Sequence, residues 1–210
     1  MTPQRRGRLV ALEGIDGVGK STLIHGLARA LRRRGLSVAV RREPADRRLG
    51  ALAQSAAAED AWTGAVYFTV DRHLAAAALE RDLRRFDVVL QDRSFYSTLA
   101  YQGSALPPRD RRRLAELQHS ATRAPDRVLL LNLEPTAAIR RLGGRASRRG
   151  PLEQVRTLRR VAAAYRALAR ANRWQVLDAR EPPRRLLRDA LERLTPVLAG
   201  RRTERRARRR

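Results

Sequence analysis

The stretch from Leu9 to Thr22, LVALEGIDGVGKST, constrains the fold of this chain more than any other. A short apolar run at 9–12 predicts a buried strand, which Glu13 ends, and an apolar periodic segment from Leu23 predicts a helix. Between them lies the phosphate-loop pattern of glycine, four residues, glycine, lysine and serine. The pattern therefore stands between a strand and a helix N-terminus, where phosphate binding requires it.

The residue types of this loop suit a triphosphate. Glycines let backbone N–H groups turn toward phosphate oxygens, and the helix that starts near Gly19 adds unpaired N–H groups and the positive end of its dipole. Lys20 is expected to reach the β- and γ-phosphates, and the Ser21 hydroxyl to ligate Mg²⁺. The residues predicted to bind the phosphates of ATP are Gly14, Ile15, Asp16, Gly17, Val18, Gly19, Lys20, Ser21 and Thr22.

Lys20 is also the only lysine among the 46 lysine and arginine residues of the chain. Arginine supplies the positive charge everywhere else. At the phosphate loop a compact ammonium on a flexible stem fits better than a planar guanidinium. Since chance could have placed a single lysine anywhere, its position supports the phosphate-loop interpretation.

Length and composition indicate a globular domain. The chain has 210 residues, of which 43% are hydrophobic, so we expect a single domain over residues 1–200 with a full core. The absence of cysteine excludes disulfides and cysteine metal sites. No run approaches the roughly 20 apolar residues of a membrane span, and the apolar run after the basic N-terminus is too short for a signal peptide. We therefore expect a cytoplasmic location.

The formal net charge of +25 is extreme. Such a charge favours non-specific binding of polyanions at low salt. Residues 201–210 hold seven arginines and one glutamate, and this basic tail is predicted to be disordered.

Five short apolar segments alternate with helical patterns and predict an α/β fold: a five-stranded parallel sheet with helices on both faces. The glycine- and arginine-rich segment 143–150, GGRASRRG, has no apolar anchor and predicts a mobile loop. The strands are expected at 9–12, 37–40, 87–90, 127–133 and 174–178, and helices after the phosphate loop and at 47–58, 61–85, 94–102, 109–123, 135–142, 151–173 and 182–198.

In open parallel sheets, ligands bind beyond the carboxyl ends of the strands. The residues that follow the predicted strands here are of phosphate-binding and metal-binding types. They are the segments 13–20 and 42–44, the pair Asp92-Arg93, and the arginines of the 143–150 loop. This edge is therefore the predicted site, and the candidate metal ligands are Ser21, Asp16 and Asp92.

Several of these motifs together resemble the thymidylate kinase family over residues 8–178. They are the loop GIDGVGKST, the triplet Arg42-Glu43-Pro44, Phe68 with Asp71-Arg72 and His73, and Asp92-Arg93 followed by Ser97 and the AYQG of 100–103. The resemblance implies a P-loop kinase fold and phosphorylation of dTMP to dTDP with ATP and Mg²⁺. It also implies a homodimer.

The resemblance further implies roles for residues at the acceptor. Phe68 looks like the ring that stacks on thymine, Arg72 like the arginine that hydrogen-bonds the base, and Tyr101 like the tyrosine beneath the deoxyribose. Asp16 resembles the aspartate near the acceptor sugar and the metal. The implied acceptor-binding set, which includes phosphate contacts, the proline of the sugar pocket and a polar group facing the base, is Arg42, Glu43, Pro44, Phe68, Arg72, Arg93, Thr98, Tyr101 and Glu153.

The 143–150 segment fits the lid of this family. Because the phosphate loop itself contains no arginine, the lid is expected to supply the cation that closes on the transferring phosphoryl group. Which lid arginine acts stays open. The implied catalytic set is Lys20, Asp16, Arg93, Arg145, Arg148 and Arg149.

Three departures from the family pattern leave other readings open. After Pro44 the family pattern has glycines, where this chain has the segment 45–48, ADRR. Ser94 stands where an aromatic residue is common, and the acidic segment after the lid is reduced to 152–154. The alternatives are a deoxynucleoside kinase with Glu43 as general base, a kinase of another nucleoside monophosphate or small metabolite, and a nucleic-acid-associated binding protein, which only the charge supports.

Overall fold

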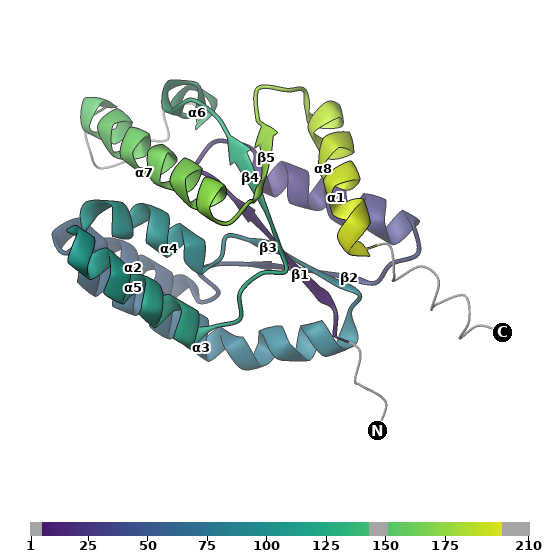
Figure 1. Ribbon diagram of the computed structural model, residues 1–210, viewed down its shortest axis with the longest axis horizontal. Coiled ribbons are helices and arrows are strands. Elements are labelled where there is room, and N and C mark those ends of the chain that lie inside the picture. Colours follow the sequence, from purple (N-terminus) through teal and green to yellow (C-terminus); the bar gives the residue numbers. More distant parts are fainter. Residues whose placement is uncertain (1–5, 143–150, 199–210) are drawn as a thin grey trace.

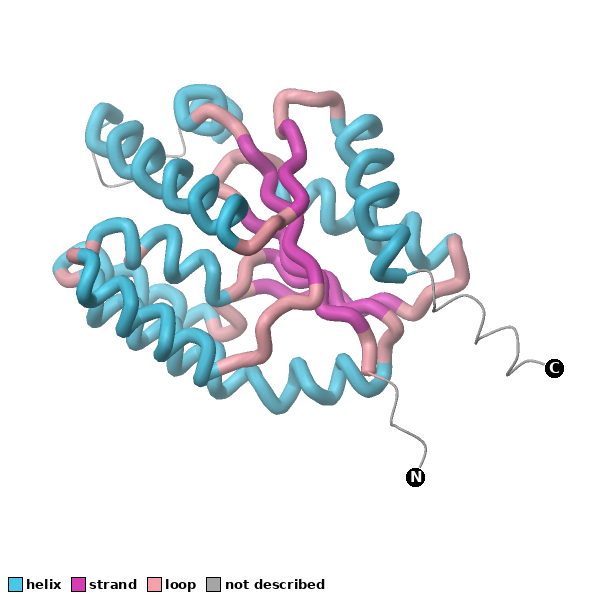
Figure 2. The backbone as a smooth tube through the Cα atoms, in the orientation of Figure 1, coloured by secondary structure: helices cyan, strands magenta, loops and turns pink. Residues whose placement is uncertain are grey.

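The computed structural model describes residues 6–142 and 151–198, apart from the side chains of 151–154. Its centre is a five-stranded parallel sheet in the order β2-β3-β1-β4-β5, which confirms the predicted fold class (Figure 1, Figure 2). The strands are β1 (Arg8–Glu13), β2 (Val38–Arg42), β3 (Val88–Asp92), β4 (Arg127–Asn132) and β5 (Gln175–Asp178).

Two of these strands run further than their apolar pattern indicated. β2 and β3 were expected to end near 40 and 90, yet they extend to Arg42 and Asp92, which pair with each other in register. Backbone pairing with a neighbour continues the strand although the side chains have become polar. The strands therefore carry charged groups at their own carboxyl ends.

Helices cover both faces of the sheet (Figure 1). α1 and α8 pack together on one face, and α3, α4, α5 and α7 lie on the other. The predicted 94–102 helix is shorter because Ser94 caps its N-terminus. The helices are α1 (Lys20–Arg33), α2 (Arg47–Glu59), α3 (Ala61–Arg85), α4 (Phe95–Tyr101), α5 (Pro108–Ala121), α6 (Pro135–Leu142), α7 (Pro151–Ala171) and α8 (Pro183–Leu198), with a 3₁₀ turn at Gly103–Ala105.

β1 lies at the middle of the sheet and is buried on both faces. Val10 and Leu12 belong to the large core under α1 and α8, whereas Leu9 packs with α3 and Ala11 with α4. Alternate side chains of a strand point to opposite faces, so a strand covered on both sides is apolar throughout. This is why residues 9–12 are all apolar, whereas the buried carboxylate of Glu13 at the end of β1 needs hydrogen-bond partners.

The register of the strands brings the predicted site segments together. Leu12 pairs with Asp92, and Asp92 pairs with Arg42, so the ends of β1, β3 and β2 form one row. The phosphate loop follows β1 directly. The segments 13–20 and 42–44 and the pair Asp92-Arg93 thus meet at the carboxyl edge of the sheet as expected, while the 143–150 loop lies outside the described residues.

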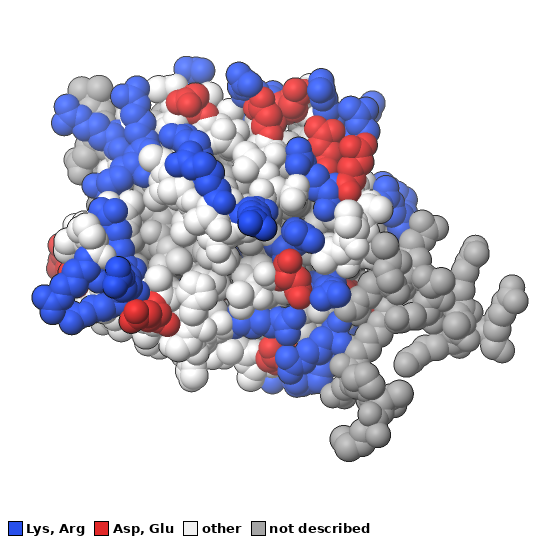
Figure 3. Space-filling view, viewed as in Figure 1, with Lys and Arg blue, Asp and Glu red and all other residues white. Residues whose placement is uncertain are grey.

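Basic side chains spread over the face seen in Figure 3, with acidic side chains among them. They do not gather there into one stripe of the kind that a nucleic-acid-binding surface presents. In the part of the chain that the structure describes, no helix combines the length and apolarity needed to cross a membrane. The predicted lid at 143–150 and basic tail at 201–210 lie outside the described residues, and the single-domain assignment stays a prediction.

Candidate functional site

The phosphate loop joins β1 to α1 and depends on its glycines. Gly17 has φ +84°, and a Cβ there would collide with the backbone oxygen of Ala138. Gly19 has φ +94° and forms the N-cap of α1 without a side-chain hydrogen bond. The first N–H groups of α1 therefore face the loop and can receive an anion.

Lys20 is buried beneath this loop, at 7% exposure. Its Nζ donates to the carbonyl oxygens of Gly14 at 3.0 Å and Ile15 at 2.9 Å. Burial, followed by the charge of Arg93, lowers the pKa of Lys20 to about 8. A bound phosphate would oppose this shift, because an adjacent anion favours the charged ammonium.

Ser21 and Asp92 form a pair that suits a hard cation. Ser21 Oγ donates to Asp92 Oδ2 at 3.0 Å, while Asp92 Oδ1 is buried and has no hydrogen-bond partner in the described structure. A buried carboxylate oxygen without a donor is costly unless a ligand satisfies it. Mg²⁺ binds through one or two carboxylates, substrate phosphates and water, so these residues fit it.

Protein ligands alone do not complete a metal site. Among the residues that the structure describes, no group of three His, Cys, Asp or Glu side chains could hold a metal ion. The third predicted ligand, Asp16, has both carboxylate oxygens bound by protein donors, at 2.6 Å from Arg93 and 3.2 Å from Tyr101. Its geometry gives no support to the predicted metal role.

Arg93 lies at the centre of the site in a strained backbone conformation, with φ +73°. Its guanidinium binds Asp16 and stacks over the Tyr101 ring at 5.2 Å from the centroid. Burial opposes ionisation of Asp16, but the charges of Arg93 and Lys20 outweigh it and lower the pKa of that carboxyl. Such strained residues persist where the surroundings fix them, and they cluster at functional sites.

Glu13 was predicted to lie at the site edge but without a role, and its buried carboxylate shares two hydrogen-bond partners with Arg93. Glu13 is fully buried and accepts from the N–H and Oγ of Ser94, both at 2.7 Å, from Ser97 Oγ at 2.7 Å and from Tyr165 Oη at 3.0 Å. Ser97 and Tyr165 also lie 3.1 and 3.3 Å from Arg93 Nη1. The serine that departs from the family pattern at 94 is therefore a partner of Glu13.

Arg72 is held in a second buried cluster. Its Nε and Nη2 donate to Glu43 Oε2 at 3.0 and 2.8 Å, and Nη2 also donates to Thr98 Oγ1 at 3.2 Å. Gln91 Nε2 occupies the other Glu43 oxygen at 2.7 Å. Both Glu43 oxygens are thus engaged by protein donors, which disfavours the alternative role of Glu43 as a general base.

These two clusters border a cavity of about 430 Å³ between α2, α3, α4 and α7. Phe68, whose stacking role competed with burial in the core, is half-buried and lines this cavity. Sequence reasoning missed the polar lining residues Gln54 and Arg160, because no motif marks them, and it gave no role to Gln102 of the AYQG motif. The predicted acceptor residues on its wall are Arg42, Glu43, Pro44, Phe68, Arg72, Arg93, Thr98 and Tyr101, joined by Asp16.

The loop after Pro44 keeps its shape without the glycines that the family pattern carries. The buried carboxylate of Asp71, on α3, accepts from the N–H groups of Ala45 at 2.8 Å and Asp46 at 2.7 Å. Asp46 then caps α2 by accepting from the next N–H groups. This departure therefore leaves the cavity wall in place.

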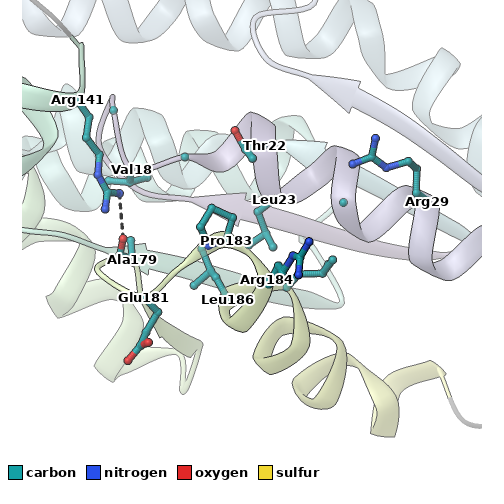
Figure 4. A pocket seen from close by; sticks show the side chains of 14 residues that line it. Val18, Thr22, Leu23, Arg29, Arg141, Ala179, Glu181, Pro183, Arg184 and Leu186 are labelled. Atoms are coloured by element: carbon teal, nitrogen blue, oxygen red, sulfur yellow. Dashed lines mark hydrogen bonds between the residues drawn. The ribbon is translucent and has the colours of Figure 1, made fainter.

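A second cavity, of about 580 Å³, lies between the phosphate loop and the β5–α8 connection (Figure 4). Val18 and Thr22 line one side, and Glu181 and Pro183 the other (Figure 4). Arg141 closes one end by donating to the carbonyl oxygen of Ala179 at 2.9 Å. Sequence reasoning did not find this cavity, because it forms between segments that are distant in the chain.

A third cavity, of about 390 Å³, shares lining residues with the other two. Lys20, Ser21 and Asp92 line it, and it shares Arg141 with the second cavity and Arg93 with the first. Across the site, the 580 Å³ cavity beside β5–α8 comes first, then the polar 390 Å³ cavity at the phosphate loop, and then the 430 Å³ cavity that Phe68 and Tyr101 line. This arrangement suits the transfer of a charged group between two bound molecules.

Some predicted residues lie outside this picture. Arg145, Arg148 and Arg149 are outside the described residues. Glu153 is in the first turn of α7, but its side chain is not among those described.

Comparison with known proteins points to one family. The family described as thymidylate kinase matches residues 12–190. A thymidylate kinase of Paracidovorax citrulli is 39% identical, over 85% of this chain and 88% of the relative. A probable thymidylate kinase of Pyrobaculum calidifontis is 33% identical, over 91% and 97%, and a thymidylate kinase of Leifsonia xyli is 38% identical, over 85% and 90%.

Proposed function

Because the chain belongs to the thymidylate kinase family and is a dTMP kinase, we propose that its three adjoining cavities hold ATP, the reacting phosphates and dTMP. The observation that carries this assignment is the shared walls of the cavities. Two nucleotides bound in the outer cavities then meet at the phosphate loop.

The donor occupies the cavity beside β5–α8. The backbone N–H groups of the loop and the Lys20 ammonium bind its phosphates. Its base and sugar lie between Val18 and Pro183, with Arg141 at the phosphate end.

Ser21 and Asp92 hold Mg²⁺ together with the donor phosphates and water. The buried Asp92 Oδ1, which has no hydrogen-bond partner in the described structure, supports this placement. The ion, when bound, neutralises charge that develops on the phosphates.

The acceptor occupies the cavity lined by Phe68, with its phosphate toward Arg42 and Arg93, its sugar on Tyr101 and its base between Phe68 and Arg72. An acceptor phosphate oxygen is already ionised at neutral pH, so the reaction needs no strong general base. Catalysis consists of positioning two anions and neutralising their charge. The engaged state of Glu43 agrees with such an acceptor and disagrees with a nucleoside hydroxyl.

Three further assignments rest on the sequence. The lid arginines Arg145, Arg148 and Arg149 neutralise the transferring group, Glu153 contacts the acceptor sugar, and the basic tail gives weak polyanion binding. A second copy of the chain covers α3, on which Val66, Val70 and Leu74 are 40, 43 and 67% exposed at helical spacing. This apolar face supports the homodimer that the family resemblance implies.

A coupled assay of ADP release with ATP and Mg²⁺ tests the proposal. The acceptors dTMP, dUMP, dCMP, UMP and thymidine are compared at equal concentration. We expect clear preference for dTMP. Turnover of thymidine without turnover of dTMP would overturn the assignment of the acceptor cavity and return Glu43 to the role of a base.

A further inference from the structure

Gln118, on α5, is fully buried and reaches Arg72 across 46 positions of sequence. Its Oε1 accepts from Arg72 Nη1 at 2.5 Å, and its Nε2 donates to Thr69 Oγ1 at 2.6 Å. Thr69 Oγ1 in turn donates to the carbonyl oxygen of Ala65 at 2.8 Å. A chain of hydrogen bonds thus runs from the α3 backbone through a buried amide to the guanidinium of Arg72.

This chain fixes which way the Gln118 amide faces. A threonine hydroxyl has one hydrogen, and that of Thr69 is used toward Ala65. The Thr69 oxygen can therefore only accept from Gln118. The amide must present its NH₂ group to Thr69 and its carbonyl oxygen to Arg72, so a flipped amide would break both contacts.

The contacts of Arg72 leave one donor for a ligand. A guanidinium has five N–H donors. Glu43 takes the Nε donor and one Nη2 donor, Thr98 takes the other Nη2 donor, and Gln118 takes one Nη1 donor. One Nη1 donor remains without an acceptor in the described structure, and Arg72 lines the proposed acceptor cavity.

We propose that Gln118 is a positioning residue for base selection: it holds Arg72 so that its one remaining donor meets a pyrimidine carbonyl and rejects an amino group. This inference rests on the proposed placement of the base against Arg72. Thymine carries a carbonyl at the position where cytosine carries a donating NH₂ group. Arginine has no acceptor, so a fixed N–H aimed at that position attracts the first base and repels the second.

Gln118 adds a constraint that Glu43 alone does not supply. Glu43 binds the Nε–Nη2 edge of the guanidinium, and Gln118 binds Nη1 on the other side. Two acceptors on different edges fix both the plane and the rotation of the group. Without Gln118, both Nη1 donors lack a protein acceptor, and the side chain can turn to satisfy either of them.

The test compares kcat and KM of the full chain for dTMP and dCMP, with dCMP also measured as a competitive inhibitor. Gln118→Leu replaces the amide by an apolar side chain that is one atom shorter, and so removes both hydrogen-bonding groups. We expect the ratio of kcat/KM for dTMP to that for dCMP to fall about tenfold or more. The loss should appear in KM for dTMP, with kcat at saturation and KM for ATP unchanged. An unchanged ratio would overturn the proposal.

A matched control separates positioning from loosened packing. Leu114, also on α5 and fully buried, packs in the α3–α5 core and makes no contact with Arg72 among those described. Leu114→Ala should lower stability and leave the ratio unchanged. If it lowers the ratio as much as Gln118→Leu does, packing explains the effect and the proposal fails.

Two further variants complete the test. If Gln118→Leu does not fold, Thr69→Val removes the acceptor that orients the amide and should lower the ratio in the same direction, whereas an unchanged ratio would overturn the proposal. Arg72→Ala tests the placement of the base itself. If Arg72→Ala keeps the ratio, the proposed acceptor site is wrong, whereas if only Arg72→Ala lowers it, the site stands and the role of Gln118 fails.

Discussion

Tyr165 Oη donates to the fully buried Glu13 carboxylate at 3.0 Å and accepts from Arg93 Nη1 at 3.3 Å. Glu13 and Tyr165 lie 152 positions apart in the sequence. The hydroxyl thereby links a group in the core to the arginine proposed to bind the acceptor phosphate.

Tyr165→Phe should lower kcat for dTMP by about tenfold, because it removes one polar contact from Arg93 while the ring keeps its packing. It leaves the buried Glu13 one donor short, so the free energy of unfolding should also fall by about 1–2 kcal/mol. Steady-state kinetics and urea unfolding measure the two effects. Tyr96→Phe, in an aromatic contact with Trp174, is the matched control and should leave kcat unchanged.

Lys20→Met should reduce turnover by at least about 100-fold while the fold survives, because it removes the only ammonium at the proposed phosphate site. Near wild-type turnover in this variant would contradict the phosphate-loop assignment. Circular dichroism of the same samples checks the fold.

The same variant should change the pH dependence of stability. The pKa of Lys20 is about 8 in the folded chain and 10.5 ordinarily. Between these values the unfolded chain binds a proton that the folded chain has released, so the contribution of Lys20 to stability rises with pH. Urea unfolding at about pH 7.5 and about pH 9.5 should show wild type gaining stability relative to Lys20→Met. A difference in unfolding free energy that does not change with pH would show that folding does not lower the pKa of Lys20.

Phe68→Ala should raise KM for dTMP about tenfold and leave KM for ATP unchanged, because this half-buried ring lines the acceptor cavity and not the core. Phe86→Ala, at the C-cap of α3 with Arg85 over its ring, removes a ring outside the cavity and serves as the control. A variant that mainly unfolds the protein and keeps its kinetics would place Phe68 in the core instead.

Asp92→Asn should raise the Mg²⁺ concentration needed for half-maximal activity by about tenfold or more, because it removes the charge of the one carboxylate that fits the ion. A titration of activity against Mg²⁺ at fixed ATP measures it. Asp16→Asn should shift this requirement less, since both Asp16 oxygens bind Arg93 and Tyr101. A larger shift in the Mg²⁺ requirement for Asp16→Asn than for Asp92→Asn would identify Asp16 as the metal ligand.

The sequence predicts those parts of the fold and site that local chemistry encodes. Leu9–Leu12 reads as a buried strand and Gly14–Thr22 as a phosphate loop without any knowledge of the remaining chain. The polar ends of β2 and β3 were missed, because pairing between Arg42 and Asp92 extends these strands beyond their apolar runs.

Long-range partners could not be predicted in the same way. Glu13 with Tyr165 and Arg72 with Gln118 become pairs only when the sheet and α5 place them together. No local sequence pattern around either member of these pairs indicates its distant partner. The donor cavity is a similar case, because Val18 and Pro183 meet only after α8 packs on α1.

The carboxylate of Asp71 has a consequence for how this enzyme can vary. It gathers the N–H groups of Ala45 and Asp46 from a buried position on α3, so the shape of that turn is specified by the helix beneath it and not by the turn itself. The side chain at exposed position 45 is thereby released from a backbone requirement, whereas Asp46 still caps α2. The turn that follows the cavity residue Pro44 is therefore open to redesign at 45, provided that Asp71 and the cap at 46 are kept.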